Sequence, residues 1–236
     1  MQEKSIQDLE CTALTNIFAE AGKKHGYSNM KADFTAFRDL KVSWTRTYRN
    51  AEFHVADYLK DAPEGVLQSL AETLFAKIMG EDGAKYSEEF CRYITSEQFV
   101  NEHQYTYLKR SRNITMSPAG EHKHLLDSYQ RLIDAGFVKK DENLVLVWMK
   151  NEGTGSVGYA STLMHVIVMS KMLDREDMPD YVLDYALFTQ IVKMTQGMVN
   201  FCSRKSNEAE RLEKVLSEYP RAEKAKEMLE GFCIRL

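Results

Sequence analysis

The stretch PDYVLDYALFTQIVKM, residues 179–194, carries the clearest structural pattern in the sequence. Pro179 suits the first turn of a helix, where its missing N–H would have no intrahelical partner in any case. Apolar side chains then recur at helical spacing, so the stretch predicts a buried amphipathic helix. Three of its polar residues are Thr189, Gln190 and Lys193, and the first and last of these, at i and i+4, lie on one side of that helix.

Helical and strand patterns follow one another along the rest of the chain. Pro63 and Gly80 mark the start and the end of a second helix with the same spacing. Further helices are predicted at 5–25, 87–100, 121–136 and 207–232 (broken near Pro220), and strands at 33–47, 51–59, 144–150 and 158–170. Residues 105–120 are predicted to be a basic loop, and the glycine-rich residues 153–158 a hairpin connection. This order of elements predicts an α+β fold.

The two halves of the sequence share a pattern. Each half has a strand with a tryptophan, a strand with His-Val (His54 and His165) and an acidic turn before Pro-x-x-Val-Leu. When Pro63 is placed on Pro179, the further identities are Val66 with Val182, Leu67 with Leu183, Thr73 with Thr189 and Lys77 with Lys193. The agreement favours an old duplication into residues 1–115 and 116–236, packed as one compact unit.

Composition limits the classes of protein to consider. Hydrophobic residues make up 44% and charged residues 28% of the chain, which is typical of a globular protein and not of a disordered one. The formal charge of −4 gives no overall electrostatic reason for binding nucleic acid. No apolar run approaches the ~18 residues of a membrane span. The polar first residues do not resemble a signal peptide, and the four cysteines lack CxxC spacing, so we expect a cytoplasmic protein with reduced thiols.

The C-terminal half resembles the core of the small gluzincin-type zinc metallopeptidases, which include the archaeal minigluzincins and the SprT/YgjP-like proteins. The resemblance rests on Trp148, Gly158, the strand 163–170, Leu173-Asp174, Pro179 and VLDYALF. It implies a gluzincin-like helix–sheet–helix core in which a His-Glu-x-x-His helix binds zinc, with the glutamate as general base.

The same resemblance implies that the catalytic residues are gone. The positions of the two histidines hold Thr189 and Lys193, and the position of the glutamate holds Gln190. A threonine is a poor zinc ligand, a glutamine cannot accept a proton from water, and an ammonium repels a dication. Glu213 is a candidate for the third ligand position on a downstream helix. We therefore expect no HExxH-type hydrolysis, no metal and no cofactor.

Two surfaces are candidates for binding. The resemblance implies that the strand 163–170, with His165, Val166 and Ile167, is an edge strand that could pair with an extended peptide. With the former active-site cleft, it predicts a catalytically inactive metallopeptidase-like protein that binds a peptide or protein partner.

The first alternative is a nucleic-acid-associated protein. Residues 103–113 interleave aromatic and cationic side chains, which can stack on bases and neutralise phosphates: Tyr105, Tyr107, Lys109, Arg110 and Arg112. In the simpler interpretation, the tyrosines pack inward and the cations are solvated. The second alternative is a zinc peptidase with relocated ligands.

Overall fold

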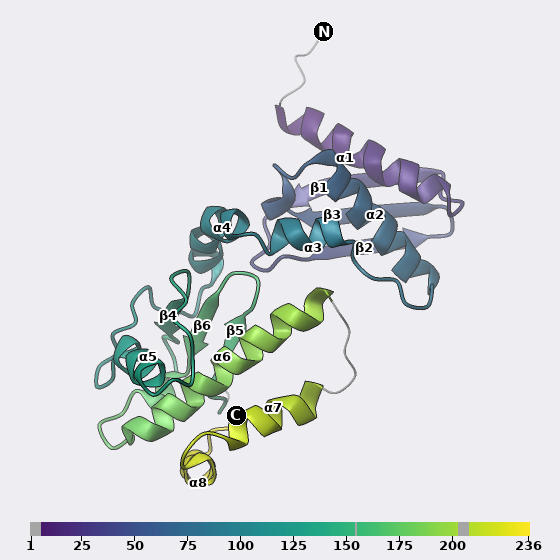
Figure 1. Cartoon of the computed structure of the whole chain (residues 1–236). Coiled ribbons are helices and arrows are strands. Elements are labelled where there is room, and N and C mark those ends of the chain that lie inside the picture. The colour runs from purple at the N-terminus through teal and green to yellow at the C-terminus, as the bar shows by residue number, and fades with distance from the viewer. Residues whose placement is uncertain (1–5, 154, 203–207) are drawn as a thin grey trace. The chain divides into compact units, whose positions relative to one another are not determined.

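The chain forms two compact units, Met1–Phe99 (unit 1) and Val100–Leu236 (unit 2), each with helices and a three-stranded sheet (Figure 1). The computed structural model describes residues 6–153, 155–202 and 208–236. The predicted α+β class is confirmed. The units divide earlier in the chain than the predicted boundary at 115/116, and α4 (Glu97–Arg110) runs across the division.

Unit 1 is a sheet with two helices on one face. The strand order is β1-β3-β2, in which β1 is parallel and β2 antiparallel to β3. Phe53 of β3 contacts Phe18 of α1 (ring centroids 4.7 Å apart) and Phe75 of α2 (5.4 Å), so aromatic rings join both helices to the sheet. The alternate residues of β3, such as Glu52, face away from this core. The elements are α1 (Ile6–Lys23), β1 (Asn29–Thr35), β2 (Val42–Thr47), β3 (Asn50–Ala56), the 3₁₀ helix η1 (Asp57–Leu59), α2 (Glu64–Met79) and α3 (Glu88–Ile94).

Unit 2 repeats this arrangement with a more deeply buried sheet. The strand order is β4-β6-β5, again with one parallel and one antiparallel neighbour for the central strand. All four residues of β6 are fully buried, so both faces of this sheet are covered. Arg131 of α5 donates two hydrogen bonds to Asp184 of α6 (2.7 and 2.8 Å), which ties these helices together. The elements are α5 (Leu125–Asp134), β4 (Val145–Trp148), β5 (Gly158–Ser161), β6 (Val166–Met169), the 3₁₀ helix η2 (Lys171–Leu173), α6 (Asp180–Cys202), α7 (Glu208–Ser217) and α8 (Ala222–Gly231).

One sequence shift relates the two sheets. The 116-residue shift that places the start of β1 on the start of β4 (29 to 145) also matches the first residues of three other pairs of elements: β2 and β5, β3 and β6, and α2 and α6. The parallel pairs keep the same register, since Asn29 lies opposite Asn50 and Val145 opposite Val166. The antiparallel registers differ by two residues because the β2–β3 turn has two residues and the β5–β6 turn has four. The two units therefore share one topology.

Several local predictions are confirmed. Pro63 precedes α2, Gly80 ends it with a left-handed φ of 75°, and Pro179 precedes α6. The Ser87 side chain caps α3 by accepting a hydrogen bond from the Phe90 N–H (3.1 Å). The C-terminal helical region breaks between α7 and α8, as Pro220 predicts.

Other local predictions are wrong because tertiary pairing overrides a local pattern. The predicted strand 158–170 is two antiparallel strands, β5 and β6, and the predicted helix 87–100 is α3 followed by the start of α4. Residues 105–110 of the predicted loop belong to α4. The strands β4 and β5 do not form the predicted hairpin, because β6 lies between them in the sheet.

The tryptophan and His-Val parts of the predicted repeat also lie at different places in the two units. Trp44 is in the antiparallel strand β2, whereas Trp148 is in the parallel strand β4. His54 is inside β3, whereas His165 precedes β6 in a turn. Of the parts of the predicted sequence repeat, the Pro-x-x-Val-Leu helix is therefore the one that lies at the same place in both units. Within the described residues, no helix is both long enough and apolar enough to cross a membrane.

Candidate functional site

The face of α6 that corresponds to a zinc site is largely closed. Thr189 is fully buried and Gln190 is 2% exposed. The Thr189 hydroxyl donates to the backbone carbonyl of Tyr185 (2.9 Å), so its polar group is already satisfied. Two of the three positions that the gluzincin resemblance aligns with HExxH are therefore inaccessible to a ligand.

Lys193 is the one of these three aligned positions with partial exposure. It is half-buried, and desolvation lowers the pKa of its amine below the ordinary 10.5. Glu213 on α7 is exposed, and within the described residues Lys193 forms no ion pair with it. No group of three or more His, Cys, Asp or Glu side chains in the described part of the chain is arranged to hold a metal ion.

The predicted peptide-binding edge strand is a central strand. β6 has β4 on one side and β5 on the other, so its backbone groups are engaged on both sides. Val166 and Ile167 are fully buried, and His165 lies in the preceding turn with a φ of 49°. Strand addition at residues 163–170 is excluded because no free edge exists there.

The predicted nucleic-acid segment does not form one surface. Tyr105 is 59% exposed and stacks under the Lys109 amine (4.3 Å to the ring centroid), whereas Tyr107 is 1% exposed in the core. Residues i and i+2 of a helix point in different directions, and this separates the two rings. Arg110 lies at the end of α4, and Arg112 is exposed just beyond it. Stacking of successive bases on both tyrosines is therefore sterically impossible.

Unit 2 instead contains an apolar groove that the sequence did not predict. The groove has a volume of about 380 Å³ and lies between the α5–β4 loop (135–144), α6 and α7. Most of its apolar side chains are only half-buried, so they are available for contact. The lining residues are Tyr129, Phe137, Val138, Lys139, Asp141, Leu144, Phe188, Ile191, Val192, Met194, Thr195, Gln196 and Val215.

Aromatic stacking supports one wall of the groove. Phe137 and Phe188 both pack on the ring of Tyr219, with centroids 5.1 and 5.7 Å away. Burial raises the pKa of Tyr219 to about 12, and its hydroxyl donates to the backbone carbonyl of Tyr181 (3.3 Å). The apolar surface of the groove therefore rests on a fixed aromatic cluster.

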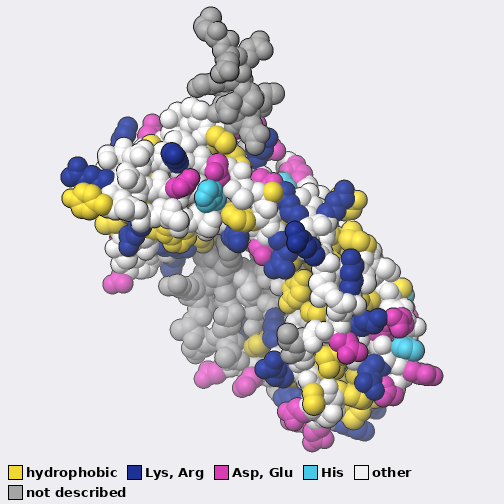
Figure 2. Space-filling model, turned by 180° about the vertical axis from the view of Figure 1, so that it is seen from behind, with side chains coloured by type: hydrophobic (Ala, Val, Ile, Leu, Met, Phe, Trp, Pro, Cys, Tyr) yellow, Lys and Arg dark blue, Asp and Glu magenta, His cyan; other side chains and the backbone are white. Residues whose placement is uncertain are grey.

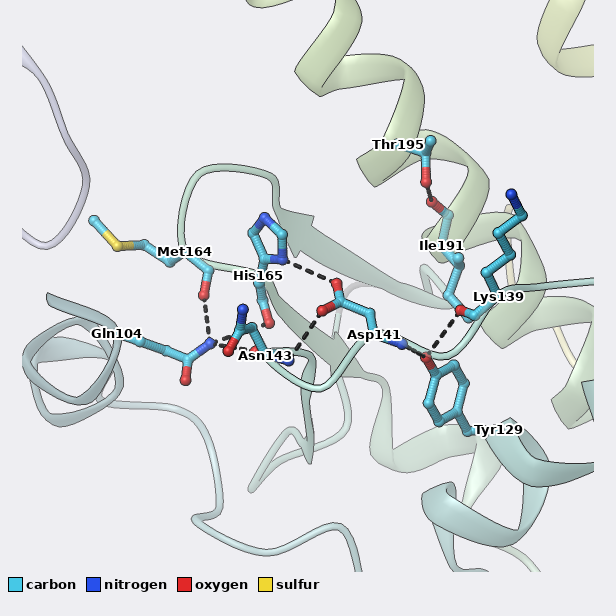
Figure 3. Close-up of polar contacts among 9 residues, drawn as sticks. All are labelled: Gln104, Tyr129, Lys139, Asp141, Asn143, Met164, His165, Ile191 and Thr195. Atoms are coloured by element: carbon cyan, nitrogen blue, oxygen red, sulfur yellow. Dashed lines mark hydrogen bonds and ion pairs between the residues drawn. The ribbon is translucent and has the colours of Figure 1, made fainter. Parts of the chain in front are cut away.

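A polar network holds the α5–β4 loop in place (Figure 3). The Tyr129 hydroxyl accepts a hydrogen bond from the Asp141 N–H (2.8 Å) and donates to the Lys139 carbonyl (3.3 Å). The Asp141 carboxylate accepts from the Asn143 N–H (2.9 Å) and lies 2.9 Å from Nδ1 of His165. The conformation of the loop is thus fixed before any ligand binds.

A second contact fixes the His165 turn to the same loop. The Gln104 side-chain amide of α4 donates to the carbonyl of Asn143 (2.7 Å) and to that of Met164 (2.8 Å). Figure 3 places Asp141 between the imidazole of His165 on one side and Tyr129 on the other. The side chain of Asp141 is therefore committed to orienting the loop, and what the groove offers a ligand is mainly apolar contact.

The corresponding place in unit 1 is filled. The shift of 116 residues places Phe75 on Ile191, and Phe75 is fully buried whereas Ile191 is half-buried. His25 and Tyr27 pack on the Phe75 ring at 5.6 and 5.4 Å. The connection before the first strand is residues 24–28 in unit 1 but 135–144 in unit 2. The longer loop of unit 2 supplies the wall that makes a groove, and the difference in length appears only with the observed helix and strand bounds.

No protein-family model matches this chain, and neither a curated protein nor a solved structure matches it. The structure therefore establishes the class of this chain alone: an α+β protein of two compact units, with an apolar groove in the second unit.

Proposed function

We propose that this chain is a catalytically inactive, metallopeptidase-like binding module that holds an apolar segment of a peptide or protein partner in the groove of unit 2. The proposal rests on the half-buried apolar side chains that line the groove of unit 2. The equivalent place in unit 1 is occupied by the buried Phe75 ring and its neighbours, so it offers no such groove. Burying one large aliphatic or aromatic side chain of a partner contributes about 1.5–3 kcal/mol. The fixed loop keeps the entropic cost of binding low.

The absence of peptidase chemistry is the second part of the proposal. Thr189, Gln190 and Lys193 occupy the positions that the gluzincin resemblance assigns to zinc chemistry, and none of them can perform it. Stoichiometric zinc in the purified protein, lost on Glu213→Gln, would contradict this part and would support a peptidase with relocated ligands.

Ancestry and location form the third part. The single shift that relates the strands and the helices α2 and α6 supports an internal duplication. The longer loop of unit 2 then represents a later specialisation for binding. Cys11, Cys91 and Cys233 are free thiols, which supports a reducing compartment such as the cytoplasm.

Selection from a displayed random-peptide library on the immobilised full chain tests the binding role. We expect the selected peptides to be rich in large apolar residues. A synthetic copy of one such peptide, titrated by calorimetry, should bind the Val192→Glu variant at least about tenfold more weakly, since a buried unpaired charge is costly.

Leu126→Glu is the matched control. Leu126 is an exposed apolar residue of α5 outside the groove lining, so the same change there should leave binding unaltered. Equal loss in the two variants, or selection of polar peptides only, would refute the groove as the binding site.

A further inference from the structure

The outer edge of β2 in unit 1 is unpaired. β2 pairs with β3 alone, and the register runs without a bulge from Val42 opposite Val55 to Thr47 opposite Asn50. The Ala56 N–H donates to the Lys41 carbonyl (3.0 Å), so Lys41 and Ala56 are a hydrogen-bonded pair of this ladder. By the register, Ser43–His54, Thr45–Glu52 and Thr47–Asn50 are the next such pairs.

Because such pairs alternate along an antiparallel ladder, the residues between them present their backbone groups outward. These residues are Val42, Trp44 and Arg46. Within the described residues, no backbone hydrogen bond engages their outward N–H and C=O groups. Natural edge strands are usually blocked by proline, bulges or a covering element, and β2 has neither a proline nor a bulge.

Exposed apolar side chains gather beside this edge. Trp44 is 44% exposed, Tyr48 90% and Met79 51%, and these are the exposed large hydrophobic residues among the described residues of unit 1. The Arg46 guanidinium donates to the Ile78 carbonyl (3.3 Å), which places the end of α2 next to β2. An edge with free backbone groups and adjoining apolar side chains has the properties of a strand-addition site.

Two exposed cations lie at the edge and its turn. Arg46 and Arg49 are exposed, and no carboxylate in the described part of the chain forms an ion pair with either of them. Arg49 lies over the ring of Tyr48 (5.4 Å) at the turn. Figure 2 shows hydrophobic side chains next to Lys and Arg side chains at one edge of the unit that carries the N-terminus. This surface complements an acidic partner.

The same charge disfavours a second copy of this chain as the occupant. β2 carries Arg46 and has Arg49 beside it but contains no carboxylate, so a second β2 edge lacks the charge complementarity that an acidic segment offers. A nucleic acid could use the arginines and aromatic rings but has no peptide groups to pair with the outward N–H and C=O groups.

The corresponding strand of unit 2 lacks these features. By their registers to the central strands, Trp44 (opposite Phe53) corresponds to Gly158 (opposite Met169), and Arg46 (opposite Ala51) corresponds to Ala160 (opposite Ile167). The tryptophan and the cation of this edge therefore have no counterpart in β5. Unit 1 also lies outside the segment that resembles the gluzincins.

We propose that the edge of β2 accepts an extended acidic segment of a partner protein as an additional strand of the unit 1 sheet. The backbone of that segment pairs with Val42, Trp44 and Arg46. Its apolar residues lie against Trp44 and Tyr48, and its carboxylates pair with Arg46 and Arg49.

Fluorescence anisotropy of the full chain tests this proposal, with the labelled octapeptide Thr-Val-Thr-Glu-Thr-Val-Thr-Glu as the probe. Its valines and glutamates share one face of a strand, as Trp44 and Arg46 do on β2. We expect saturable binding below about 1 mM that weakens with salt. Replacing glutamate by lysine, or methylating alternate backbone nitrogens of the peptide, should each weaken binding at least about tenfold. Because Trp148 is buried, the fluorescence of Trp44 gives an independent signal.

Variants separate this surface from the groove. Arg46→Glu should abolish binding of the acidic probe, and Val42→Pro should do so by removing an outward N–H that the ladder does not use. Lys31→Glu, the same charge change at an exposed position of β1, should preserve binding, as should Val192→Glu in the groove.

Three outcomes would overturn the strand-addition site. These are equal binding of the lysine peptide, unaltered binding by Val42→Pro, and no binding of the acidic probe at about 1 mM. Self-association that Val42→Pro abolishes would assign the edge to a second copy, and tighter binding of a single-stranded oligonucleotide would assign the surface to nucleic acid. Since Val192→Glu affects only the groove, failure here leaves the test of the groove intact.

Discussion

The side-chain hydroxyls of Thr73 and Thr189 make the same bond in the two units. Each donates to the backbone carbonyl four residues earlier in its own helix, to Ser69 and to Tyr185, over 2.9 Å in both cases. Both threonines are buried, and a carbonyl of the preceding turn is a common partner for a threonine inside a helix. Thr189, which the gluzincin resemblance aligns with a zinc-binding histidine, therefore has a structural role that needs no ligand.

Restoring a histidine at this position should destabilise the fold. Thr189 has no exposed surface, and forcing a larger side chain into a packed site costs about 1–3 kcal/mol. We expect Thr189→His to lower the free energy of unfolding by that amount in urea denaturation. Lys193→His, at a half-buried position of the same helix, should cost less than about 1 kcal/mol. Equal costs would show that the site is not closed.

Lys193 and Lys77 occupy equivalent positions in α6 and α2, and replacing them should change the free energy of unfolding in opposite directions. Desolvation lowers the pKa of Lys193, so its charge destabilises the folded chain at every pH below its ordinary pKa of 10.5. Lys193→Met should therefore raise the free energy of unfolding at pH 7, because it removes the desolvated charge. The gain should shrink as the pH approaches 10.5.

Lys77 is the matched comparison. Its amine lies 3.5 Å from the centroid of the Tyr86 ring, so Lys77→Met removes a cation–π contact and should lower the free energy of unfolding by about 0.5–1 kcal/mol. Urea denaturation at pH 7 measures both variants. A loss of stability in Lys193→Met would indicate that its amine has a favourable partner.

Asp174 should make the stability of unit 2 sensitive to acid. Its carboxylate accepts hydrogen bonds from three consecutive backbone N–H groups, at Glu121 (2.6 Å), His122 and Lys123 (2.9 Å each). Burial acts to raise its pKa, but these bonds outweigh burial and hold the pKa below the ordinary 3.8. A carboxylate with a lowered pKa stabilises the fold above its ordinary pKa, and that stability disappears as the pH falls through its folded pKa.

Asp174→Asn tests this relationship. The neutral side chain should lower the free energy of unfolding at pH 7 by about 2–3 kcal/mol, because it weakens the charge-assisted hydrogen bonds from three backbone N–H groups. The difference from the unaltered protein should diminish below about pH 4. A difference that stays constant between pH 7 and pH 3 would argue against the carboxylate's charge as the source.

Unit 1 should fold by itself. Its aromatic core of Phe18, Phe53 and Phe75 comes entirely from residues 1–99. A fragment of residues 1–99 is expected to unfold cooperatively on heating, as followed by circular dichroism. A fragment of residues 1–62, which lacks α2 and hence Phe75, should not. Non-cooperative melting of the longer fragment would show that unit 1 needs the rest of the chain.

The sequence by itself determined the helix boundaries at Pro63, Gly80 and Pro179 and the α+β class, and it shows Thr189, Gln190 and Lys193 at the positions that the gluzincin resemblance aligns with HExxH. These features depend on local backbone chemistry and on the identity of single side chains, which a sequence contains directly. The repeated Pro-x-x-Val-Leu helix was also visible, because residues that cap and bury a helix recur at fixed spacing.

Only the tertiary structure decided which surfaces are accessible. The sequence could not place β6 at the centre of its sheet or leave β2 at an edge, because strand neighbours are chosen by hydrogen bonds between distant segments. The groove depends on a loop that is held by Tyr129, Asp141 and His165, which come from separate parts of the sequence. Their contacts exist only after the chain has folded, so local patterns could not predict the site that we propose binds a partner.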